Sequence, residues 1–253
     1  MLRSMYSGIS GMRGFQTKLD VIGNNIANVN TSGFKKGRVT FQDMMSQTTR
    51  GAQAPVDGGR GGINPMQVGL GSKIGSIDNI HTQGFVQSTG NGLDLAIEGN
   101  GMFAVTDGTT TYYTRAGNFY LDEEGNIVNA DGYYLIDSSG DYPITIPEGA
   151  QSFSIATDGT VNIVNAEGNP QVVGTIGLVG FSNPAGLEKV GNNLYLNTPN
   201  AGMNPIANPE SEGLGKIVSG ALEMSNVDLA EEFTEMIVAQ RGFQANTRII
   251  TTS

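Results

Sequence analysis

The sequence contains no cysteine and no tryptophan, and its single histidine is His81. Without cysteine, the chain cannot form a disulfide framework, a thiolate metal site or a cysteine nucleophile. Charged residues make up only 15% of the 253 residues, and the formal net charge is −10. A nucleic-acid backbone is bound by clustered Lys and Arg side chains, so this charge balance argues against a nucleic-acid partner.

Long apolar runs are also missing. No stretch of about 18 consecutive apolar residues appears, so we expect no membrane-spanning helix and no membrane insertion. The start, Met1-Leu2-Arg3-Ser4, lacks the unbroken apolar core and cleavage site of a secretory signal. We therefore expect a protein that stays in the cytosol or is exported by a route that recognises something other than a secretory signal.

Residue patterns typical of enzymes are weak. His81 stands alone among Asn79, Ile80 and Thr82, as an ordinary loop or strand histidine does, and no Gly-x-Ser-x-Gly elbow surrounds any serine. The acidic turns at 122–126 and 137–141 do not follow EF-hand spacing, and the glycines at 99 and 101 open no helix. Paired carboxylates for glycoside cleavage stay open, because their separation depends on the fold. The sequence predicts no catalytic residues, no cofactor and no metal site.

Both ends of the chain carry apolar residues at alternating steps of three and four, which places them on one narrow helical stripe. The N-terminal stripe consists of Leu2, Met5, Ile9, Met12, Gln16, Leu19, Gly23 and Ile26. The C-terminal stripe consists of Leu229, Phe233, Met236, Gln240, Phe243, Thr247 and Ile250. The pattern predicts long terminal helices, over 1–30 and 225–253, paired as a coiled coil in an antiparallel or staggered arrangement.

Glycines weaken the first of these helices. Gly8, Gly11, Gly14 and Gly23 each cost about 1 kcal/mol relative to Ala. Burying a Leu, Ile or Phe side chain returns about 1.5–3 kcal/mol, so the helix becomes stable only when its apolar stripe is covered. We therefore expect residues 5–25 to be disordered in the free monomer and helical in an assembly.

The first helix runs into three asparagines, Asn24, Asn25 and Asn28. Asn side chains compete for backbone hydrogen bonds and favour a helix end. Two interpretations stay open here: the amides cap the exit from the helix, or they bond a neighbouring subunit.

The composition and the apolar spacing change twice in the middle of the chain. Residues 31–75 include a Gly/Gln/Pro-rich stretch at 50–72 and are predicted to be an extended or irregular linking segment. From 76 to 224 the apolar period becomes two, as in Leu93, Leu95 and Ile97, and Asp-Gly turns such as Asp107-Gly108 separate short apolar runs. The prediction is an α+β protein with a central, mainly antiparallel β-domain between the terminal helices.

Several motifs resemble those of one family. Residues 20–36 read DVIGNNIANVNTSGFKK, residues 219–229 read SGALEMSNVDL, and residues 236–241 read MIVAQR. Between them stand LDLAI at 93–97 and YTRAGNF at 113–119. These stretches are similar to the signatures of the bacterial flagellar rod and hook proteins, in the same order and over essentially the whole chain.

The resemblance implies a structural subunit without enzymatic activity, which assembles with identical copies into a helical tube that transmits torque for motility. The assembly interface is then predicted to comprise Leu2, Met5, Ile9, Met12, Leu19, Ile22, Ile26, Asn24, Asn25, Asn28, Leu229, Phe233, Met236, Gln240, Phe243 and Ile250. Composition alone leaves a remote alternative, an oligomeric extracellular β-domain enzyme or carbohydrate binder with coiled-coil ends.

Within the family, the motifs Gly69-Leu70-Gly71 and Ala221-Leu222-Glu223 through Gln240-Arg241 look closer to hook proteins, whereas the short length looks closer to distal rod proteins. The interpretation favours the hook, with the distal rod as the alternative, and expects stiffness to be decided in the 50–68 segment. The resemblance also implies a final helix that continues past Ser253. Implied partners are rod proteins, the hook cap, hook–filament junction proteins and the flagellar type III export apparatus, which carries subunits outside without a cleaved signal peptide.

Overall fold

The computed structural model describes residues 2–55 and 61–252. The chain divides into two compact units. The first, here the helical unit, comprises residues 1–27, 37–79 and 228–253, and the second, the β unit, comprises residues 28–36 and 80–227. In the described parts of the chain, neither helix has an apolar stretch long enough to span a bilayer.

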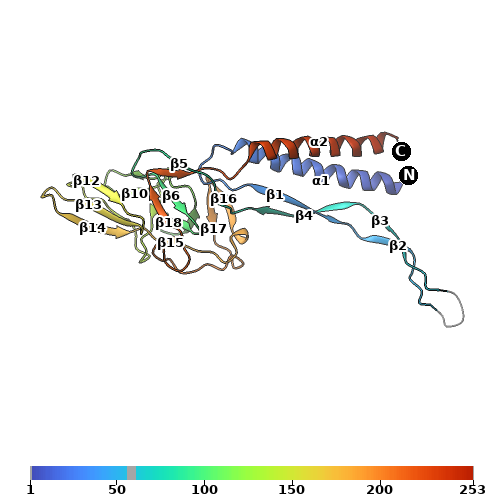
Figure 1. Cartoon of the computed structure of the whole chain (residues 1–253), viewed down its shortest axis with the longest axis horizontal. Coiled ribbons are helices and arrows are strands. Elements are labelled where there is room, and N and C mark those ends of the chain that lie inside the picture. Colours follow the sequence, from blue (N-terminus) through green and yellow to red (C-terminus); the bar gives the residue numbers. More distant parts are fainter. Residues whose placement is uncertain (1, 56–60, 253) are drawn as a thin grey trace. The chain divides into compact units, whose positions relative to one another are not determined.

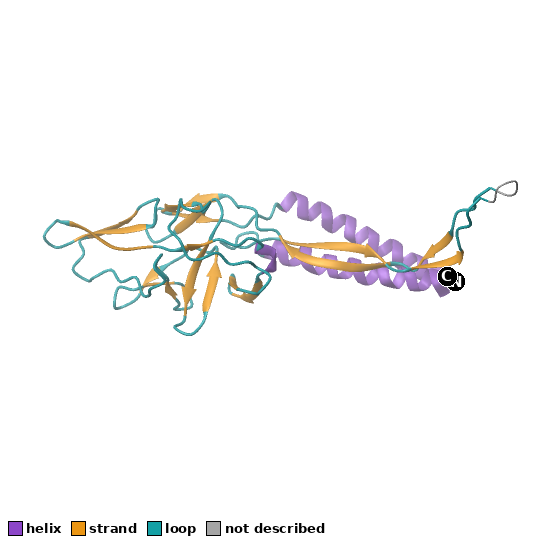
Figure 2. Cartoon of the chain, turned by 90° about the horizontal axis from the view of Figure 1, so that it is seen from below, coloured by secondary structure: helices purple, strands orange, loops and turns teal. Residues whose placement is uncertain are grey.

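Two long antiparallel helices, α1 (Leu2–Ala27) and α2 (Leu229–Thr252), lie side by side in the helical unit (Figures 1 and 2). Helix α2 begins where the sequence places a start signal. Asp228 Oδ1 accepts hydrogen bonds from the backbone N–H groups of Ala230, at 2.8 Å, and Glu231, at 3.4 Å. This N-cap satisfies amides that have no partner inside the helix, and the carboxylates of the first turn complement the helix dipole.

Small residues bring the two helices close together. A Cβ atom on Gly11 would lie 3.0 Å from Asn246 Nδ2, and one on Gly242 would lie 2.6 Å from Phe15 Cζ. Larger residues at these positions would force the helices apart, so the glycines that weaken α1 as an isolated helix also permit the contact. Further along, Lys18 forms an ion pair with Glu235.

The two helices lie antiparallel, and the residues of the predicted α2 stripe differ in exposure: Met236, Phe243, Thr247 and Ile250 are half-buried. The buried residues of α2 are Glu232 and Ala239, whereas Leu229, Phe233 and Gln240 of the predicted stripe are exposed. Gly8 lies beside Ile250, and Gly242 lies beside Phe15, so glycines and apolar side chains both stand where the helices meet. Coiled-coil packing along the stripes stays a prediction.

Residues 37–50 and 66–79 form a two-stranded ribbon. Strand β1 (Gly37–Asp43) pairs with β4 (Ser72–Asn79), and β2 (Ser46–Arg50) pairs with β3 (Met66–Gly69), both antiparallel. The Phe41 ring on β1 lies 5.9 Å from the Phe15 ring on α1. The expectation of an extended or irregular segment over 31–75 was therefore incomplete, because cross-strand backbone pairing replaces apolar anchors. Residues 56–60, inside the predicted 50–72 stretch, lie outside the described residues.

The β unit is entirely antiparallel, as predicted. Its largest sheet has the order β16-β17-β8-β7-β11-β10-β9, with β15 also paired to β7; the remaining sheets are β12-β13-β14, β18-β6 and β19-β5. The strands are β5 (Val86–Ser88), β6 (Leu95–Glu98), β7 (Met102–Thr106), β8 (Thr111–Thr114), β9 (Tyr120–Leu121), β10 (Ile127–Val128), β11 (Tyr134–Leu135), β12 (Ser152–Ile155), β13 (Thr160–Val164), β14 (Pro170–Thr175), β15 (Leu178–Val179), β16 (Glu188–Gly191), β17 (Leu194–Leu196), β18 (Lys216–Ser219) and β19 (Ala221–Glu223). A 3-10 turn spans Pro184–Gly186.

Turn chemistry fixes the hairpins of this unit. Between β7 and β8, Asp107 Oδ1 accepts hydrogen bonds from the N–H groups of Thr109 and Thr110, and Gly108 has φ +90°. Only a residue that tolerates positive φ fits there without strain. The Asp-Gly turn signal read from the sequence is therefore confirmed at this position.

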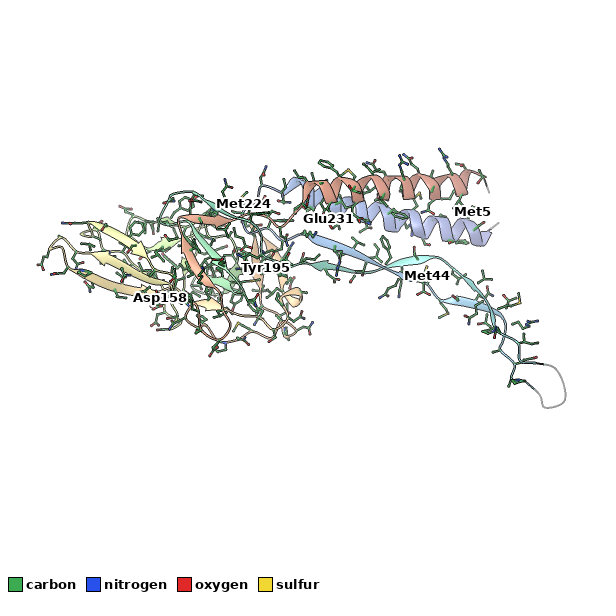
Figure 3. All side chains as sticks on the ribbon, viewed as in Figure 1. Met5, Met44, Asp158, Tyr195, Met224 and Glu231 are labelled. Carbon is green, nitrogen blue, oxygen red and sulfur yellow. The ribbon has the colours of Figure 1, made fainter. Side chains whose placement is uncertain are left out.

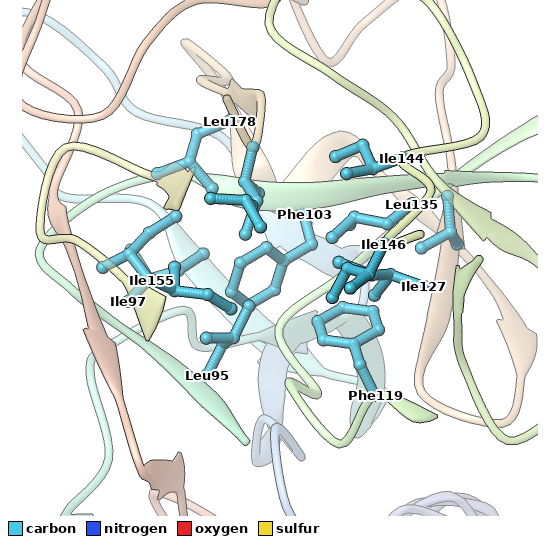
Figure 4. Close-up of a cluster of buried hydrophobic side chains, with 14 of the residues drawn as sticks. Leu95, Ile97, Phe103, Phe119, Ile127, Leu135, Ile144, Ile146, Ile155 and Leu178 are labelled. Carbon is cyan, nitrogen blue, oxygen red and sulfur yellow. The ribbon is translucent and has the colours of Figure 1, made fainter. Parts of the chain in front are cut away.

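The core of the β unit is a cluster of aliphatic side chains around two phenylalanines (Figure 4). Phe103 and Phe119 meet edge to face, with ring centroids 5.3 Å apart. Leu95, Ala96 and Ile97 of β6 are all fully buried, so this strand has no solvent face. The alternation inferred from the sequence is too simple here, because side chains of the β unit cover both faces of β6.

Candidate functional site

The chain passes between the two units four times, and a group of polar side chains inside the β unit ties these passages together. The passages follow Ala27, Lys36, Asn79 and Val227. We call this group the junction cluster; its members are Lys35, Thr82, Arg115, Glu223 and Asn226.

Asn226 is the central connector of the junction cluster. Its Oδ1 accepts a hydrogen bond from the backbone N–H of Lys36 at 2.8 Å, while its Nδ2 donates to Ile80 O at 2.8 Å and to Thr82 Oγ1 at 2.9 Å. Ile80 N also donates to Lys36 O at 2.9 Å. One carboxamide therefore holds three segments that are far apart in the sequence, each within a few residues of a passage point.

A buried ion pair lies beside Asn226. Lys35 Nζ donates to Glu223 Oε1 at 2.5 Å and to Thr82 O at 2.8 Å, and the side chains of both charged residues are fully buried. Gly84 N donates to the same Glu223 oxygen at 2.9 Å. Burial lowers the pKa of Lys35, and the carboxylate of Glu223 opposes that shift. Removing both charges from water costs free energy, which their mutual attraction offsets. The loss of either partner would leave the other as an uncompensated buried charge and would strongly destabilise the fold.

Arg115 adds a second cation to the cluster. Its Nη1 lies 3.6 Å from Glu223 Oε2, and its guanidinium donates to Ile97 O and to Gly99 O, the latter at 2.6 Å. Burial lowers the pKa of Arg115, against the stabilising charge of Glu223. Two buried cations thus share one carboxylate, so the negative charge of Glu223 compensates both Lys35 and Arg115.

The backbone turn that brings Lys35 into place requires glycine. Gly33 has φ +71°, and a Cβ atom on it would lie 2.5 Å from Ala116 N. Any L side chain at position 33 would therefore meet both backbone strain and a steric clash. This explains the glycine between the asparagine-rich helix end and Lys35.

His81 lies next to the junction cluster. Its ring centroid is 5.5 Å from that of Tyr195, which Figure 3 labels in the β unit, and neither ring nitrogen has a hydrogen-bond partner within the described residues. Burial, followed by the charges of Lys35, Lys189 and Arg115, lowers the pKa of His81 to about 4. The same burial, with the charge of Glu223, raises the pKa of Tyr195 to about 12.

His81 and Arg115 also line a cavity of about 360 Å³ in the β unit. An effective general acid or base has a pKa near the working pH, and that of His81 is far below neutrality. Among the described residues, no group of three or more His, Asp or Glu side chains could hold a metal ion. This arrangement gives no chemical support for catalysis.

A second asparagine connects segments inside the helical unit. Asn25 is 2% exposed, its Nδ2 donates to Gly37 O at 2.9 Å, and its Oδ1 accepts from Gly37 N at 2.9 Å. The same Nδ2 lies 3.2 Å from Glu232 Oε2. Asn25 thus pairs with the backbone as a neighbouring strand would. Its own chain thus occupies this amide, and a bond from it to a neighbouring subunit stays a prediction.

The other predicted interface residues have varied exposure, and all of them except Asn28 lie in the helical unit. Ile22 is buried; Met5, Ile9, Met12, Leu19, Ile26, Asn28, Met236, Phe243 and Ile250 are half-buried; Asn24, Leu229, Phe233 and Gln240 are exposed. The side chain of Leu2 lies outside the part described. The alternating three-and-four spacing does not include Ile237 and Val238 of α2, which are 53% and 55% exposed. Their exposure shows that α2 has apolar surface outside the predicted stripe.

Replacing Glu223 with Gln should strongly destabilise the β unit. Lys35 and Arg115 would then be buried without a counter-charge, which typically costs about 3–5 kcal/mol. Urea unfolding at neutral pH measures the change. The matched control is Glu98→Gln, which removes a half-exposed carboxylate 2.9 Å from Lys216 and should cost less than about 1 kcal/mol. Equal effects of the two substitutions would contradict the assigned role of Glu223.

His81 should make stability depend on pH. Because its pKa is about 4 in the folded chain and about 6.5 when unfolded, the unfolded chain binds more protons between these values, so stability falls as pH falls through this window. The expected loss between pH 7 and pH 5 is about 2 kcal/mol. Urea unfolding of wild type and His81→Phe across this range measures it. An unchanged slope in the variant would refute the assignment, since the chain has no other histidine.

Comparison with protein families gives three matches along the chain. Residues 5–35 match the family described as flagella basal body rod protein, residues 96–163 match the flagellar hook protein FlgE/F/G D1 domain, and residues 218–253 match the flagellar basal body rod FlgEFG protein C-terminal family. These ranges contain Lys35, Arg115, Glu223 and Asn226 of the junction cluster.

Comparison with individual proteins extends the match to the whole chain. The chain is 60% identical to the flagellar basal-body rod protein FlgG of Bacillus subtilis, over all of this chain and 96% of the relative. It is 40% identical to the rod protein FlgG of Caulobacter vibrioides, over all of this chain and 95% of the relative. It is 32% identical to the flagellar hook protein FlgE of Borreliella burgdorferi, over all of this chain and 97% of the relative. The chain therefore belongs to the family of bacterial flagellar basal-body rod and hook proteins.

Proposed function

We propose that this chain is a structural subunit of the flagellar basal-body rod, which assembles with copies of itself into a helical tube that transmits torque. The observation that carries the proposal is the 60% identity to a rod protein over the full chain and 96% of that relative. In this proposal the chain has no catalytic role, in agreement with a family of structural proteins.

This proposal prefers the rod over the hook, although the motifs at 69–71 and 221–241 favoured the hook. Alignments with two hook relatives extend over 431 and 452 positions, far more than the 253 residues of this chain. The rod relative from Bacillus subtilis aligns over 254 positions. Hook relatives thus contain long stretches without a counterpart here, whereas the rod relative has the same extent.

The exposed apolar side chains of the helical unit support self-assembly. Leu229, Phe233, Ile237 and Val238 of α2 are each at least 40% exposed. Apolar side chains gathered on one element mark a protein–protein contact more often than a solvated surface. Burying each of them returns about 1.5–3 kcal/mol, which offsets the cost of the glycines in α1.

The partners in this proposal are copies of the same chain, other rod proteins and the hook that continues the axis. The hook cap, the hook–filament junction proteins and the type III export apparatus act in the same assembly pathway.

Deleting the gene in the source bacterium should leave basal bodies with shortened rods. A rod subunit is needed before a hook can be built, so hooks and filaments should be missing as well. Cryo-electron tomography of cell envelopes measures rod length, and expression of the wild-type chain should restore it. Full-length rods that lack only the hook would contradict the rod proposal and return the chain to the hook.

A further inference from the structure

The sequence contains two Asn-Gly pairs, Asn91-Gly92 and Asn100-Gly101, and both lie between strands of the β unit. In such a pair the backbone nitrogen of the glycine can attack the side-chain carbonyl carbon of the asparagine. Glycine permits this approach because it has no side chain and few backbone restrictions. Both pairs share this chemistry, so their surroundings decide which of them reacts.

Asn91 and Gly92 lie in an exposed turn between β5 and β6, two strands that Figure 1 labels. Asn91 O accepts a hydrogen bond from Asp94 N at 3.0 Å, and Asn91 Oδ1 accepts one from Leu93 N at 3.4 Å. The second bond folds the carboxamide back over the peptide bond to Gly92. Gly92 N has no hydrogen-bond partner among the described residues. The attacking nitrogen is therefore unoccupied and lies next to the carboxamide.

The surroundings of Asn100 restrain the backbone on several sides. Asn100 O accepts a hydrogen bond from Gly215 N at 2.7 Å. The preceding Gly99 accepts a bond from Arg115 Nη2 at 2.6 Å and donates one to Gln83 Oε1 at 3.1 Å. A Cβ atom on Gly99 would lie 2.9 Å from the Cα atom of Gly215. Ring closure at an asparagine requires rotation of its backbone, so we expect a slow reaction at Asn100.

We propose that Asn91 is a site of spontaneous deamidation. Gly92 N loses its proton to water and forms a C–N bond to Asn91 Cγ, and the side-chain NH2 group leaves with a proton as ammonia. The product is a five-membered succinimide. Water then adds to one of its two carbonyl carbons and breaks one C–N bond. Opening at the side-chain carbonyl gives aspartate, and opening at the backbone carbonyl gives isoaspartate. The net reaction consumes one water molecule and releases one ammonia.

The product weakens a contact inside the β unit. In the intact turn, Asn91 Nδ2 donates to Asp94 Oδ1 at 3.3 Å. A carboxylate at position 91 has no N–H group, so two negative charges face each other there. Asp94 O accepts a bond from Gly220 N at 2.8 Å, and Thr89 N donates to Gly220 O at 2.8 Å. Gly220 directly precedes β19, the strand that carries Glu223 of the junction cluster.

This inference concerns the single chain and does not rest on the proposed function. The reaction needs only water, so the modified fraction increases with the time since synthesis. Each event adds one negative charge to a chain whose formal net charge is already −10. Copies of identical sequence thus come to differ at this turn according to their age.

Incubating the full-length chain in mildly alkaline buffer tests the site, because a higher pH favours the deprotonated backbone nitrogen. Tandem mass spectrometry of peptides locates each replacement of NH2 by OH, and electron-transfer fragmentation separates isoaspartate from aspartate. The reaction should be at least about tenfold faster at Asn91 than at Asn100, because an exposed turn opens at a lower free energy than a restrained one. Asn91 that stays intact, or a faster reaction at Asn100, would overturn the proposal.

Gly92→Ala tests the attacking nitrogen. A Cβ atom at position 92 would lie 3.5 Å from Phe153 Cε2, an ordinary van der Waals contact, and the φ of Gly92 is not positive. The fold should therefore accept the substitution, while the methyl group should slow the reaction at Asn91 about tenfold or more. The matched control is Gly149→Ala in another exposed turn, which should leave the rate at Asn91 unchanged. An unchanged rate in Gly92→Ala would refute the mechanism.

Amide hydrogen exchange tests the weakened contact. Asn91→Asp introduces the charge of the product without altering the backbone, and isoaspartate in the incubated chain adds the altered backbone. The amides of Thr89, Gly90 and Gly220 should exchange at least about threefold faster in both forms than in fresh wild type, because the local opening costs less free energy. The amides of β7 should be unaffected. Equal exchange at residues 89, 90 and 220 in all three samples would overturn the structural consequence.

Discussion

The two long helices leave part of their apolar surface uncovered within one chain, and this constraint bears on the rest of the molecule. Where the helices meet, a Cβ atom on Gly11 would lie 3.0 Å from Asn246 Nδ2 and one on Gly242 would lie 2.6 Å from Phe15 Cζ, and Lys18 forms an ion pair with Glu235. On α2, Phe233, Ile237 and Val238 are 50–55% exposed. We propose that other copies of the chain cover them.

The β unit is built in the opposite way. Its core of leucine, isoleucine and phenylalanine side chains is complete within one chain, so this unit can fold without partners. Its junction cluster fixes the segments through which the chain leaves it. In the proposed rod, force would pass along these segments, and the bonds of Asn226 and the Lys35–Glu223 pair restrain them where they emerge.

Sequence reasoning found the features that depend on local pattern. The terminal helices, the antiparallel β-domain and the Asp107-Gly108 turn follow from spacing and turn chemistry, and the motifs identify the family.

Features that depend on which residues meet in space could not be predicted from the sequence. No local pattern around Lys35 indicates its burial, because its partner Glu223 is 188 positions away. The spacing also did not indicate that Gly11 and Gly242 lie against the Asn246 and Phe15 side chains of the opposite helix. The choice of hook over rod relied on short motifs, whereas full-length comparison favours the rod.

The central claim is that the N-terminal helix depends on neighbouring copies for its stability. Amide hydrogen exchange, followed by mass spectrometry on the monomer and on assembled tubes, tests this most directly. The account predicts fast exchange of residues 5–25 in the monomer, while the core strands of the β unit are protected, and slow exchange of the same residues in the tube. Strong protection of residues 5–25 in the monomer would contradict it.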